Sequence, residues 1–243
     1  MQYWALTDTG IVRTQNQDAY QAEQLDRNTF VCVVCDGMGG AKSGDVASTL
    51  AADAFMQTVK QSRKNNMNQA ELESMFQSAL DFANLTVYNQ AMQTEEYAGM
   101  GTTLVALMIQ GKQAILLNVG DSRGYLVNEA GIEQITEDHS LVQMMISRGE
   151  LTLEEARNHP DKNIITRAVG TQAQAKGDIF HREVKVGEQF LLCTDGLSNL
   201  MDDREILFEV AYEEDREQCC QRLVDLAKKR GAPDNVTCVL VTV

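Results

Sequence analysis

The hydrophobic positions form two patterns along the chain: short continuous apolar runs and longer stripes with a helical spacing. Apolar runs predict strands at about residues 3–9 and 29–35, with turn-forming residues at 26–28 before the second strand. Helical stripes run from about 44 to 62 and from about 68 to 92. These two stretches predict amphipathic helices that each cover one face of a sheet.

The second half of the chain is richer in strands. Strands are predicted at 102–109, 113–119 and 123–127, and their connections at 110–112 and 120–122 are too short for a helical crossover, so we expect antiparallel pairing between them. The remaining predictions are strands at 164–168, 178–183, 189–194 and 236–243, and helices at 140–158 (split at Gly149), 203–212 and 215–230.

Strands that outnumber helices and pair through tight turns indicate an α+β fold and not a regular βαβ alternation. We expect a four-layer α-β-β-α sandwich, in which two antiparallel sheets are flanked by helices. Packing of one sheet on the other would bring strand ends that are remote in sequence to a common edge.

Composition limits the domain organisation and the partners. The chain has 243 residues, is 44% hydrophobic and has two prolines and no low-complexity linker, so we expect one compact domain over 1–243. A formal net charge of -14 argues against nucleic acid and anionic membranes as partners. No leader or membrane-spanning run is evident, so we expect a cytoplasmic protein, and we expect a monomer.

Aspartates at strand ends are the main chemical signal. Asp36 follows the apolar run 29–35 and precedes Gly37, and the pattern returns downstream at Asp195, before a glycine, and at Asp234, before an asparagine. A carboxylate on a rigid strand end, next to glycines that allow close approach, suits a hard divalent cation that takes oxygen ligands. The sequence therefore predicts a metal site made of aspartates.

Other metal and phosphate motifs fail on spacing. Cys32 and Cys35 lie three apart on a strand and face opposite sides, so they cannot converge on zinc and are interpreted as buried apolar residues. Ala41 precedes Lys42 where a Walker A loop needs glycine, and a dinucleotide-binding loop would need glycine at Lys42. The histidines are isolated in polar surroundings and are interpreted as structural or surface residues: His139, His159 and His181.

Seven segments in order resemble the metal-dependent protein phosphatase family (PPM, type 2C), over nearly the whole chain. They are residues 10–18, 34–40 with the helix start at 44–48, 101–104, 118–123, 138–142, 192–197 and 234–237. The resemblance implies hydrolysis of phosphoserine and phosphothreonine in proteins, on two antiparallel sheets sandwiched between helices. It also implies two Mn²⁺ or Mg²⁺ ions whose bridging hydroxide attacks phosphorus.

The resemblance assigns roles to the aspartates. Asp36 would bridge the two ions, the Gly37 carbonyl would bind one of them, and Asp195 and Asp234 would hold the other. In bacterial members a third, weaker ion lies near the position of Asp121 and shares Asp195, so Asp121 is a candidate ligand. Asp121 could equally be a capping residue of its turn.

Three further residues have expected roles around the ions. Asp18 would orient metal-bound waters, and Asn235 would support the ligands without touching the metal. Arg13 is the candidate for binding the substrate phosphate, because a planar guanidinium can hold two phosphate oxygens and stabilise transition-state charge. Arg13, Asp36 and Asp195 are therefore the expected catalytic residues.

The chain departs from animal-type members at Met38, where those members place a histidine proposed as general acid. Gln17 stands where many relatives carry an acidic residue, and both departures are common in bacterial-type members. The general acid is left unassigned. Residues 141–165 fall where bacterial members carry a flap beside the site, which we expect to influence substrate choice, although a simple surface helix pair has the same pattern.

Two functions remain open from the sequence. The leading hypothesis is an active phosphatase whose partners are phosphorylated proteins, including a serine/threonine kinase and its substrates. The alternative is a catalytically silent phosphoprotein-binding scaffold of the same fold, against which the intact aspartate set argues. Strand-end aspartates are often turn or cap residues, and this is the interpretation for Asp8, Asp26 and Asp138.

Overall fold

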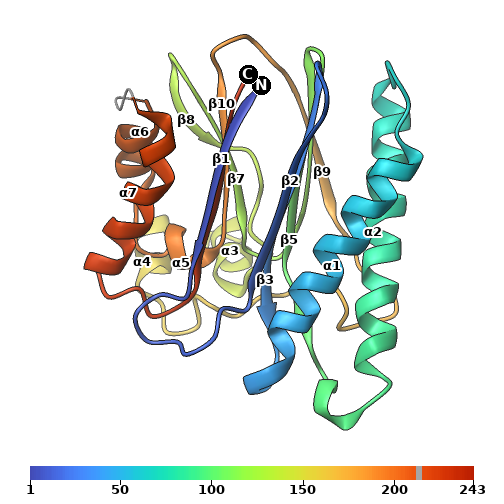
Figure 1. Cartoon of the computed structure of the whole chain (residues 1–243). Coiled ribbons are helices and arrows are strands. Elements are labelled where there is room, and N and C mark those ends of the chain that lie inside the picture. The colour runs from blue at the N-terminus through green and yellow to red at the C-terminus, as the bar shows by residue number, and fades with distance from the viewer. Residues whose placement is uncertain (212–214) are drawn as a thin grey trace.

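Two β-sheets lie face to face between two layers of helices (Figure 1). The structure is a computed structural model that describes residues 1–211 and 215–243, with all side chains of these residues except those of 40–42. All the strand pairs in the described residues are antiparallel. The expected α-β-β-α sandwich is confirmed.

Each sheet has its own strand order. The first sheet runs β1-β11-β10-β7-β8, with β1 (Gln2–Asp8), β11 (Val236–Thr242), β10 (Gln189–Cys193), β7 (Arg123–Asn128) and β8 (Gly131–Gln134). The second sheet runs β2-β3-β5-β6-β9, with β2 (Asp18–Asp26), β3 (Thr29–Met38), β5 (Leu104–Gln110), β6 (Gln113–Val119) and β9 (Asp178–Glu183); the short β4 (Gly101–Thr102) also pairs with β3.

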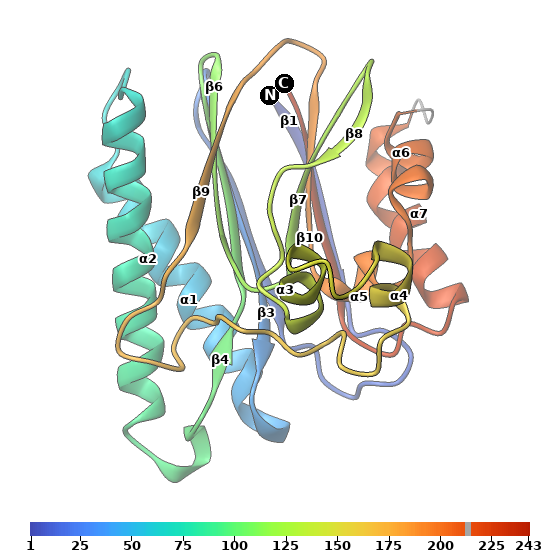
Figure 2. The same ribbon diagram turned by 180° about the vertical axis from the view of Figure 1, so that it is seen from behind.

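Helices cover the outer face of each sheet. The second sheet is covered by α1 (Gly40–Ser62) and α2 (Gln69–Ala91), and the first by α6 (Asp203–Ala211) and α7 (Arg216–Lys229). Shorter helices are η1 (Glu95–Tyr97), α3 (Leu141–Ser147), α4 (Leu153–Arg157) and α5 (Asp195–Ser198). Figure 2 shows α3 and α4 toward the lower end of the strands.

Three apolar clusters follow from these layers: one between the sheets, and one between each sheet and its helices. β3 illustrates the cause, because its run 29–35 is buried on both faces. Cys32 faces the cluster between the sheets and Cys35 faces α1 and α2, as predicted from their spacing. The cysteines are all buried and free, which confirms their interpretation as apolar residues.

Phe76 on α2 packs edge to face on Phe55 of α1, with ring centroids 5.3 Å apart, and both side chains are fully buried. Phe76→Ala is therefore expected to lower the free energy of unfolding by about 3–5 kcal/mol, since lost burial and the remaining cavity add up. Phe82→Ala, on the same helix but 49% exposed, is the matched control and should cost far less. Urea unfolding of the two variants measures both effects; equal losses would contradict this packing.

One predicted pairing is wrong. β6 and β7 do not pair with each other, because β6 lies in the second sheet beside β5 and β9, whereas β7 lies in the first beside β10 and β8. The segment 120–122 thus crosses from one sheet to the other. Gly120 adopts a φ of +107°, and a Cβ there would come within 2.6 Å of the Thr103 side chain. Asp121 consequently lies between the two sheet edges.

The strand predicted at 164–168 is also wrong: residues 164–168 are irregular, with a single bridge from Ile165 to Ser140. Their backbone is instead hydrogen-bonded to residues 139–141, where the preceding helical segment begins. The predictions missed β2, β8 and α5. They also placed Leu85 in the apolar stripe of α2, but Leu85 is 46% exposed. The helix predicted at 203–212 is confirmed to Ala211, and residue 212 lies outside the described residues.

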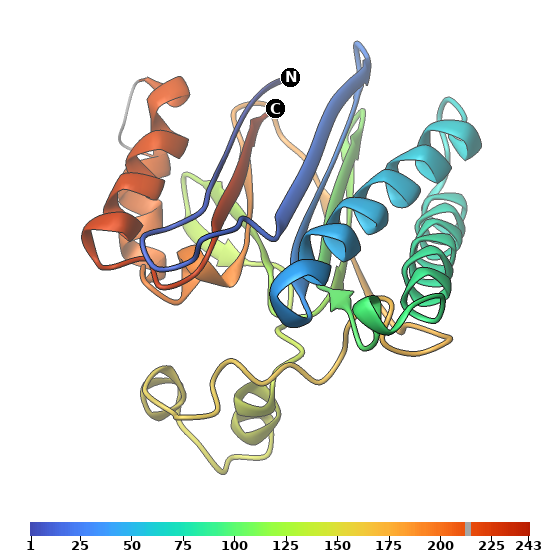
Figure 3. The ribbon, with the colours of Figure 1, turned by 60° about the horizontal axis from the view of Figure 1, so that its bottom comes forward.

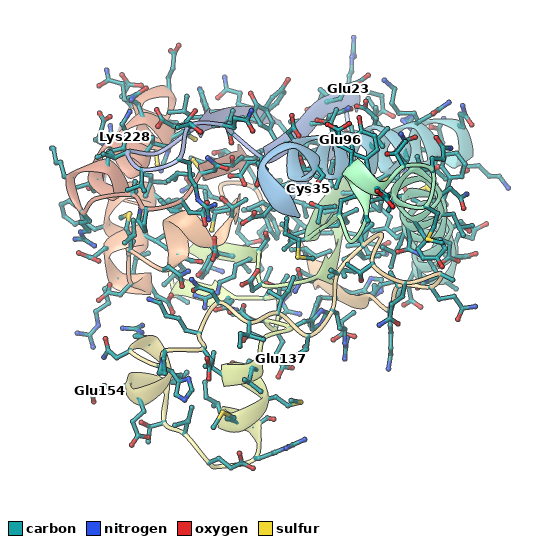
Figure 4. All side chains as sticks on the ribbon, turned by 90° about the horizontal axis from the view of Figure 1, so that it is seen from below. Glu23, Cys35, Glu96, Glu137, Glu154 and Lys228 are labelled. Carbon is teal, nitrogen blue, oxygen red and sulfur yellow. The ribbon has the colours of Figure 1, made fainter. Side chains whose placement is uncertain are left out.

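The segment 141–165 projects below both sheets, away from the main body (Figure 3). It contains α3 and α4, and we call it the flap. The two helices, split near Gly149, agree with the prediction from sequence. Seen from below, the flap with Glu154 lies to one side, whereas Cys35, in the last part of β3, lies near α1 (Figure 4).

Candidate metal centre

Asp36 is fixed through its backbone at the end of β3. Its carbonyl oxygen accepts hydrogen bonds from the Thr103 amide (2.9 Å) and the Thr102 hydroxyl (2.8 Å), and its own amide donates to Thr103 Oγ1 (2.9 Å). The next residue, Gly37, leaves no room for a side chain, because a Cβ would lie 2.0 Å from the Gly44 carbonyl oxygen at the start of α1. The strand end is therefore rigid.

Asp195 and Asp234 reach the same region from the first sheet. Asp195 follows β10 and begins α5, and its Oδ2 accepts a hydrogen bond from Asn199 one turn later (2.9 Å). Asp234 precedes β11, and its Oδ2 is bound by Arg13 Nη2 at 2.8 Å. The structure thus brings together Arg13 and Asp234, which are 221 positions apart. This contact was not predicted from sequence.

Asp18 is the most deeply enclosed carboxylate of the region, 9% exposed and paired in register with Asp36 across β2 and β3. Its Oδ2 accepts hydrogen bonds from Thr194 (2.9 Å) and Thr237 (2.6 Å) on the facing sheet. Asp18 therefore joins the two sheets at the edge where the aspartates meet.

Asn235 braces the loop that carries Arg13. Its Oδ1 accepts from the Gln17 amide (2.8 Å), and its Nδ2 donates to the carbonyls of Thr9 and Gln15 (both 2.9 Å). All its side-chain atoms are engaged with the backbone of residues 9–17. Its observed role is to hold this loop against the start of β11.

The carboxylates strongly influence one another. The pKa of Asp36 is raised well above its ordinary value, first by burial and then by the charges of Asp18, Asp195, Asp121 and Asp234. Burial, and the charge of Asp234, also raise the pKa of Asp195. Burial is the main reason that the pKa of Asp18 rises to about 7 and that of Asp121, beside Asp195, to about 8. The five aspartates predicted from sequence therefore form one electrostatic cluster.

The aspartate side chains do not converge on a common point where a metal ion could bind. Within the described residues, no three His, Cys, Asp or Glu side chains are arranged to hold a metal ion. One oxygen of Asp234 is hydrogen-bonded to Arg13, and one oxygen of Asp195 is hydrogen-bonded to Asn199. These two oxygens therefore point toward protein donors.

The donor chemistry nevertheless fits a hard divalent cation. Asp18 Oδ1 and Asp195 Oδ1 are buried without a hydrogen-bond partner among the described residues, which is a costly arrangement for carboxylate oxygens. A cation would stabilise these oxygens and offset the repulsion within the cluster. Asp36, Asp195 and Asp234 could hold such ions directly, and Asp121 could add a ligand from the cleft side.

The raised pKa values predict how stability depends on pH. A carboxyl with a raised folded-state pKa stabilises the fold fully below its unfolded value, near 4, and this contribution is lost as pH rises through the folded value. For Asp18 and Asp121 the loss therefore begins near pH 4 and is complete above the folded pKa values of about 7 and about 8. Glu205, with a pKa lowered to about 2 by Arg230, stays charged above pH 5 and does not contribute to the trend.

In chelator, the thermal midpoint is therefore expected to fall by several degrees between pH 5 and 8.5, since ~1 kcal/mol shifts the midpoint of a protein of this size by about 2–4 °C. Added Mn²⁺ should restore it, because a bound cation offsets the repulsion. Thermal unfolding followed by circular dichroism tests this expectation. A midpoint in chelator that rises with pH would contradict it.

A cleft of about 440 Å³ opens from Asp121 and Asp195 between the flap and the α5–α6 region. Asp138 lies in its wall and forms a forked ion pair with Arg123, with N–O distances of 2.7 to 3.0 Å. The prediction that Asp138 is a turn or cap residue is therefore wrong. Asn199 also lines the cleft and was missed, although its position one helical turn after Asp195 could have indicated it.

Asp8 and Asp26 do accept hydrogen bonds from the amides of Gly10 and Asn28, both at 2.8 Å, as turn residues do. Each also forms an ion pair, with Lys228 and Arg63 respectively. His181 pairs with Glu73 and His139 lies in a buried polar network, so neither lies free on the surface.

Known proteins resemble this chain over nearly its whole length. The sequence profile of the family described as protein phosphatase 2C matches residues 11–227. The serine/threonine phosphatase stp of Listeria monocytogenes serotype 4b is 34% identical over 239 residues, which span 97% of this chain and 93% of that protein.

Solved structures show the same fold. The serine/threonine phosphatase Stp1 from Staphylococcus aureus superposes with a TM-score of 0.92 at 36% identity, covering 99% of this chain and 94% of that one. The catalytic domain of the serine threonine protein phosphatase PstP, solved in complex with two manganese ions, gives a TM-score of 0.85 at 33% identity, covering 98% and 96% of the two chains.

The fold and the similarity make this chain an enzyme of the protein phosphatase class, a hydrolase. It belongs to the protein phosphatase 2C family. The resemblance inferred from the seven sequence segments is thereby confirmed. In the part of the chain that the structure describes, no helix is long and apolar enough to cross a membrane.

Proposed function

We propose that the chain is a metal-dependent serine/threonine protein phosphatase that hydrolyses phosphoserine and phosphothreonine at the aspartate cluster. The observation that carries this proposal is the convergence of Asp36, Asp195, Asp234, Asp18 and Asp121, whose burial and mutual repulsion raise the pKa of Asp36 well above its usual range. Perturbed carboxylates gathered beside a cleft are typical of a functional site. The names of the relatives, which are serine/threonine phosphatases, support the substrate class.

Asp36, Asp195 and Asp234 would hold two divalent ions, with the Gly37 carbonyl as a further ligand and Asp121 as a ligand for a third. When bound, Mn²⁺ or Mg²⁺ ions supply an activated water and neutralise charge on the phosphoryl group. The two manganese ions of the PstP complex support this number for the principal site. Asp18 would orient water from its position between the sheets.

Arg13 would bind the substrate phosphate. Its side chain is 52% exposed, and the contact with Asp234 engages Nη2, so that other donors of the guanidinium fork can take phosphoryl oxygens. Asn235 supports this role, because it fixes the backbone of the loop at both Thr9 and Gln15. The alkoxide that leaves the phosphorus atom needs a proton, and the Met38 side chain has no acidic proton to donate.

The whole chain, 1–243, would act as one catalytic domain, with the flap beside its cleft influencing substrate choice. Its partners would be phosphorylated proteins, among them a serine/threonine kinase and the substrates of that kinase. We propose that it acts as a monomer in the cytoplasm.

The test is phosphate release from phosphothreonine, phosphoserine and phosphotyrosine peptides of one sequence, with Mn²⁺, with Mg²⁺ and with chelator. Release from the first two that requires metal would support the proposal. Folded protein that releases no phosphate with either metal would contradict it and favour the phosphoprotein-binding scaffold.

A further inference from the structure

His139 holds the peptide unit on both sides of Gly120, the residue before Asp121. The Gly120 amide donates to His139 Nδ1 (3.1 Å), and the His139 amide donates to the Gly120 carbonyl (2.9 Å). The same carbonyl also accepts from Asn118 Nδ2 (3.1 Å). Both polar backbone groups of Gly120 are therefore fixed by partners near it in space.

The far side of the imidazole ring is fixed as well. His139 Nε2 lies 3.0 Å from Asp178 Oδ2 on β9, and Arg167 Nη1 lies 2.9 Å from Asp178 Oδ1 and 3.0 Å from the same ring nitrogen. The His139 side chain is only 5% exposed. The ring is thus clamped between the second sheet and the segment 120–122.

These contacts decide the tautomer of the ring. The partner of Nδ1 is a donor, the Gly120 amide, so Nδ1 accepts and carries no proton. Nε2 faces the acceptor Asp178 Oδ2, so the proton of the neutral ring is on Nε2 and is donated to Asp178. Arg167 Nη1 then donates to Asp178 and not to the ring nitrogen that it approaches. A carboxylate that accepts from one ring nitrogen fixes the tautomer and the orientation of a histidine. The other ring nitrogen is then placed to hold its own partner, here the Gly120 amide.

Asp121 has little freedom once Gly120 is fixed. Gly120 has a φ of +107° against Thr103, and Thr103 Oγ1 is hydrogen-bonded to Ser122 Oγ at 2.7 Å. The same Thr103 hydroxyl accepts from the Asp36 amide. Asp121 is therefore held between two anchored neighbours, one of which connects to the end of β3.

We infer that His139 is a positioning residue that aims Asp121 at the aspartate cluster by holding the Gly120 amide with its Nδ1 atom. His139 also belongs to the base of the flap, since its carbonyl accepts from the Thr166 amide at 2.7 Å. This inference rests on the proposed function, in which Asp121 is an ion ligand. It assigns the ring no contact with substrate.

Two substitutions at position 139 distinguish the role of Nδ1 from that of Nε2. In His139→Asn, the amide oxygen lies near the former Nδ1 position and can still accept from Gly120; in His139→Gln, the amide reaches toward Asp178 instead. We expect the Mn²⁺ concentration for half-maximal activity to rise about ten- to a hundredfold in His139→Gln and to change less than about threefold in His139→Asn. Calorimetric titration with Mn²⁺ alone should show the same difference. His181→Gln, remote from the cluster on β9, is the matched control and should resemble the wild type in both assays.

A double-mutant cycle tests whether His139 acts through Asp121. Adding His139→Gln to Asp121→Asn should have almost no further effect on the Mn²⁺ requirement, because the group being positioned is already replaced. Additive effects, or equal effects of the Asn and Gln variants that follow only their thermal midpoints, would overturn the inference.

A measurement on the wild type covers the case in which His139→Gln does not fold. Nitrogen-15 NMR of the His139 ring should show Nε2 protonated and Nδ1 unprotonated at neutral pH. A proton on Nδ1 would overturn the inference. Failure of the wild type to release phosphate would instead contradict the proposed function. The tautomer and the calorimetric titration would still test whether His139 holds the Gly120 amide.

Discussion

Asp36→Asn is expected to reduce metal-dependent phosphate release from a phosphothreonine peptide by about a thousandfold, the upper range for the loss of one preorganised charged or polar group at a reaction centre. The physical reason is that the pKa of Asp36 is raised by burial and by the charges of all four other aspartates, so its carboxylate belongs to the cluster that would hold the ions. Phosphate release at saturating Mn²⁺ measures the effect. Asp225→Asn, exposed on α7, is the matched control and should keep full activity.

The same substitution should raise the thermal midpoint in chelator, because it replaces a buried carboxyl, whose ionisation burial and its like-charged neighbours oppose, by a neutral amide. Activity and stability would then change in opposite directions. If Asp36→Asn lost activity only because the protein unfolded, the midpoint would fall, and the assignment of Asp36 to the reaction centre would lose its support.

Arg13→Ala is expected to lower kcat/KM for a phosphothreonine peptide by about a hundredfold, because a charge-assisted contact to a phosphoryl group is lost. Arg13→Lys should recover only part of this loss, since an ammonium group cannot hold two oxygens in the planar fork geometry. Steady-state kinetics of the three proteins at saturating Mn²⁺ measures both effects.

A metal-binding assay separates this role from an indirect one. Arg13 also binds Asp234, so its removal could act by releasing that carboxylate. If Arg13 contacts phosphate, Arg13→Ala should leave the affinity for Mn²⁺ within about threefold of the wild type, well below the tenfold steps typical of disturbed metal sites. A large change in Mn²⁺ affinity with unchanged kinetics at saturating metal would contradict phosphate binding by Arg13.

The strands that carry the candidate ligands could be predicted because their burial leaves a simple sequence pattern. The run 29–35 is apolar on both faces, and the structure buries both. β2 was missed because it lies at the edge of its sheet, where most of its residues are only half-buried and polar side chains interrupt the apolar ones. The short segment 120–122 was read as a hairpin, since length alone does not reveal that Gly120 turns the chain into the other sheet.

The candidate residues could be predicted, but most of their contacts could not. The positions of Asp36, Asp195 and Asp234 followed from glycine or asparagine after a strand end and from the family resemblance. The hydrogen bonds from Thr194 and Thr237 to Asp18 join segments that are more than 170 positions apart, and no local pattern encodes them. Such contacts arise from the packing of one sheet on the other.

The most direct test of the account is anomalous diffraction from crystals of this protein soaked in Mn²⁺. The account predicts two strong manganese peaks bridged by the Asp36 carboxylate, with Asp195 and Asp234 on one of them and a weaker peak beside Asp121. Peaks elsewhere, or none at the cluster in crystals that diffract well, would contradict the proposal that these aspartates form the metal centre of the phosphatase.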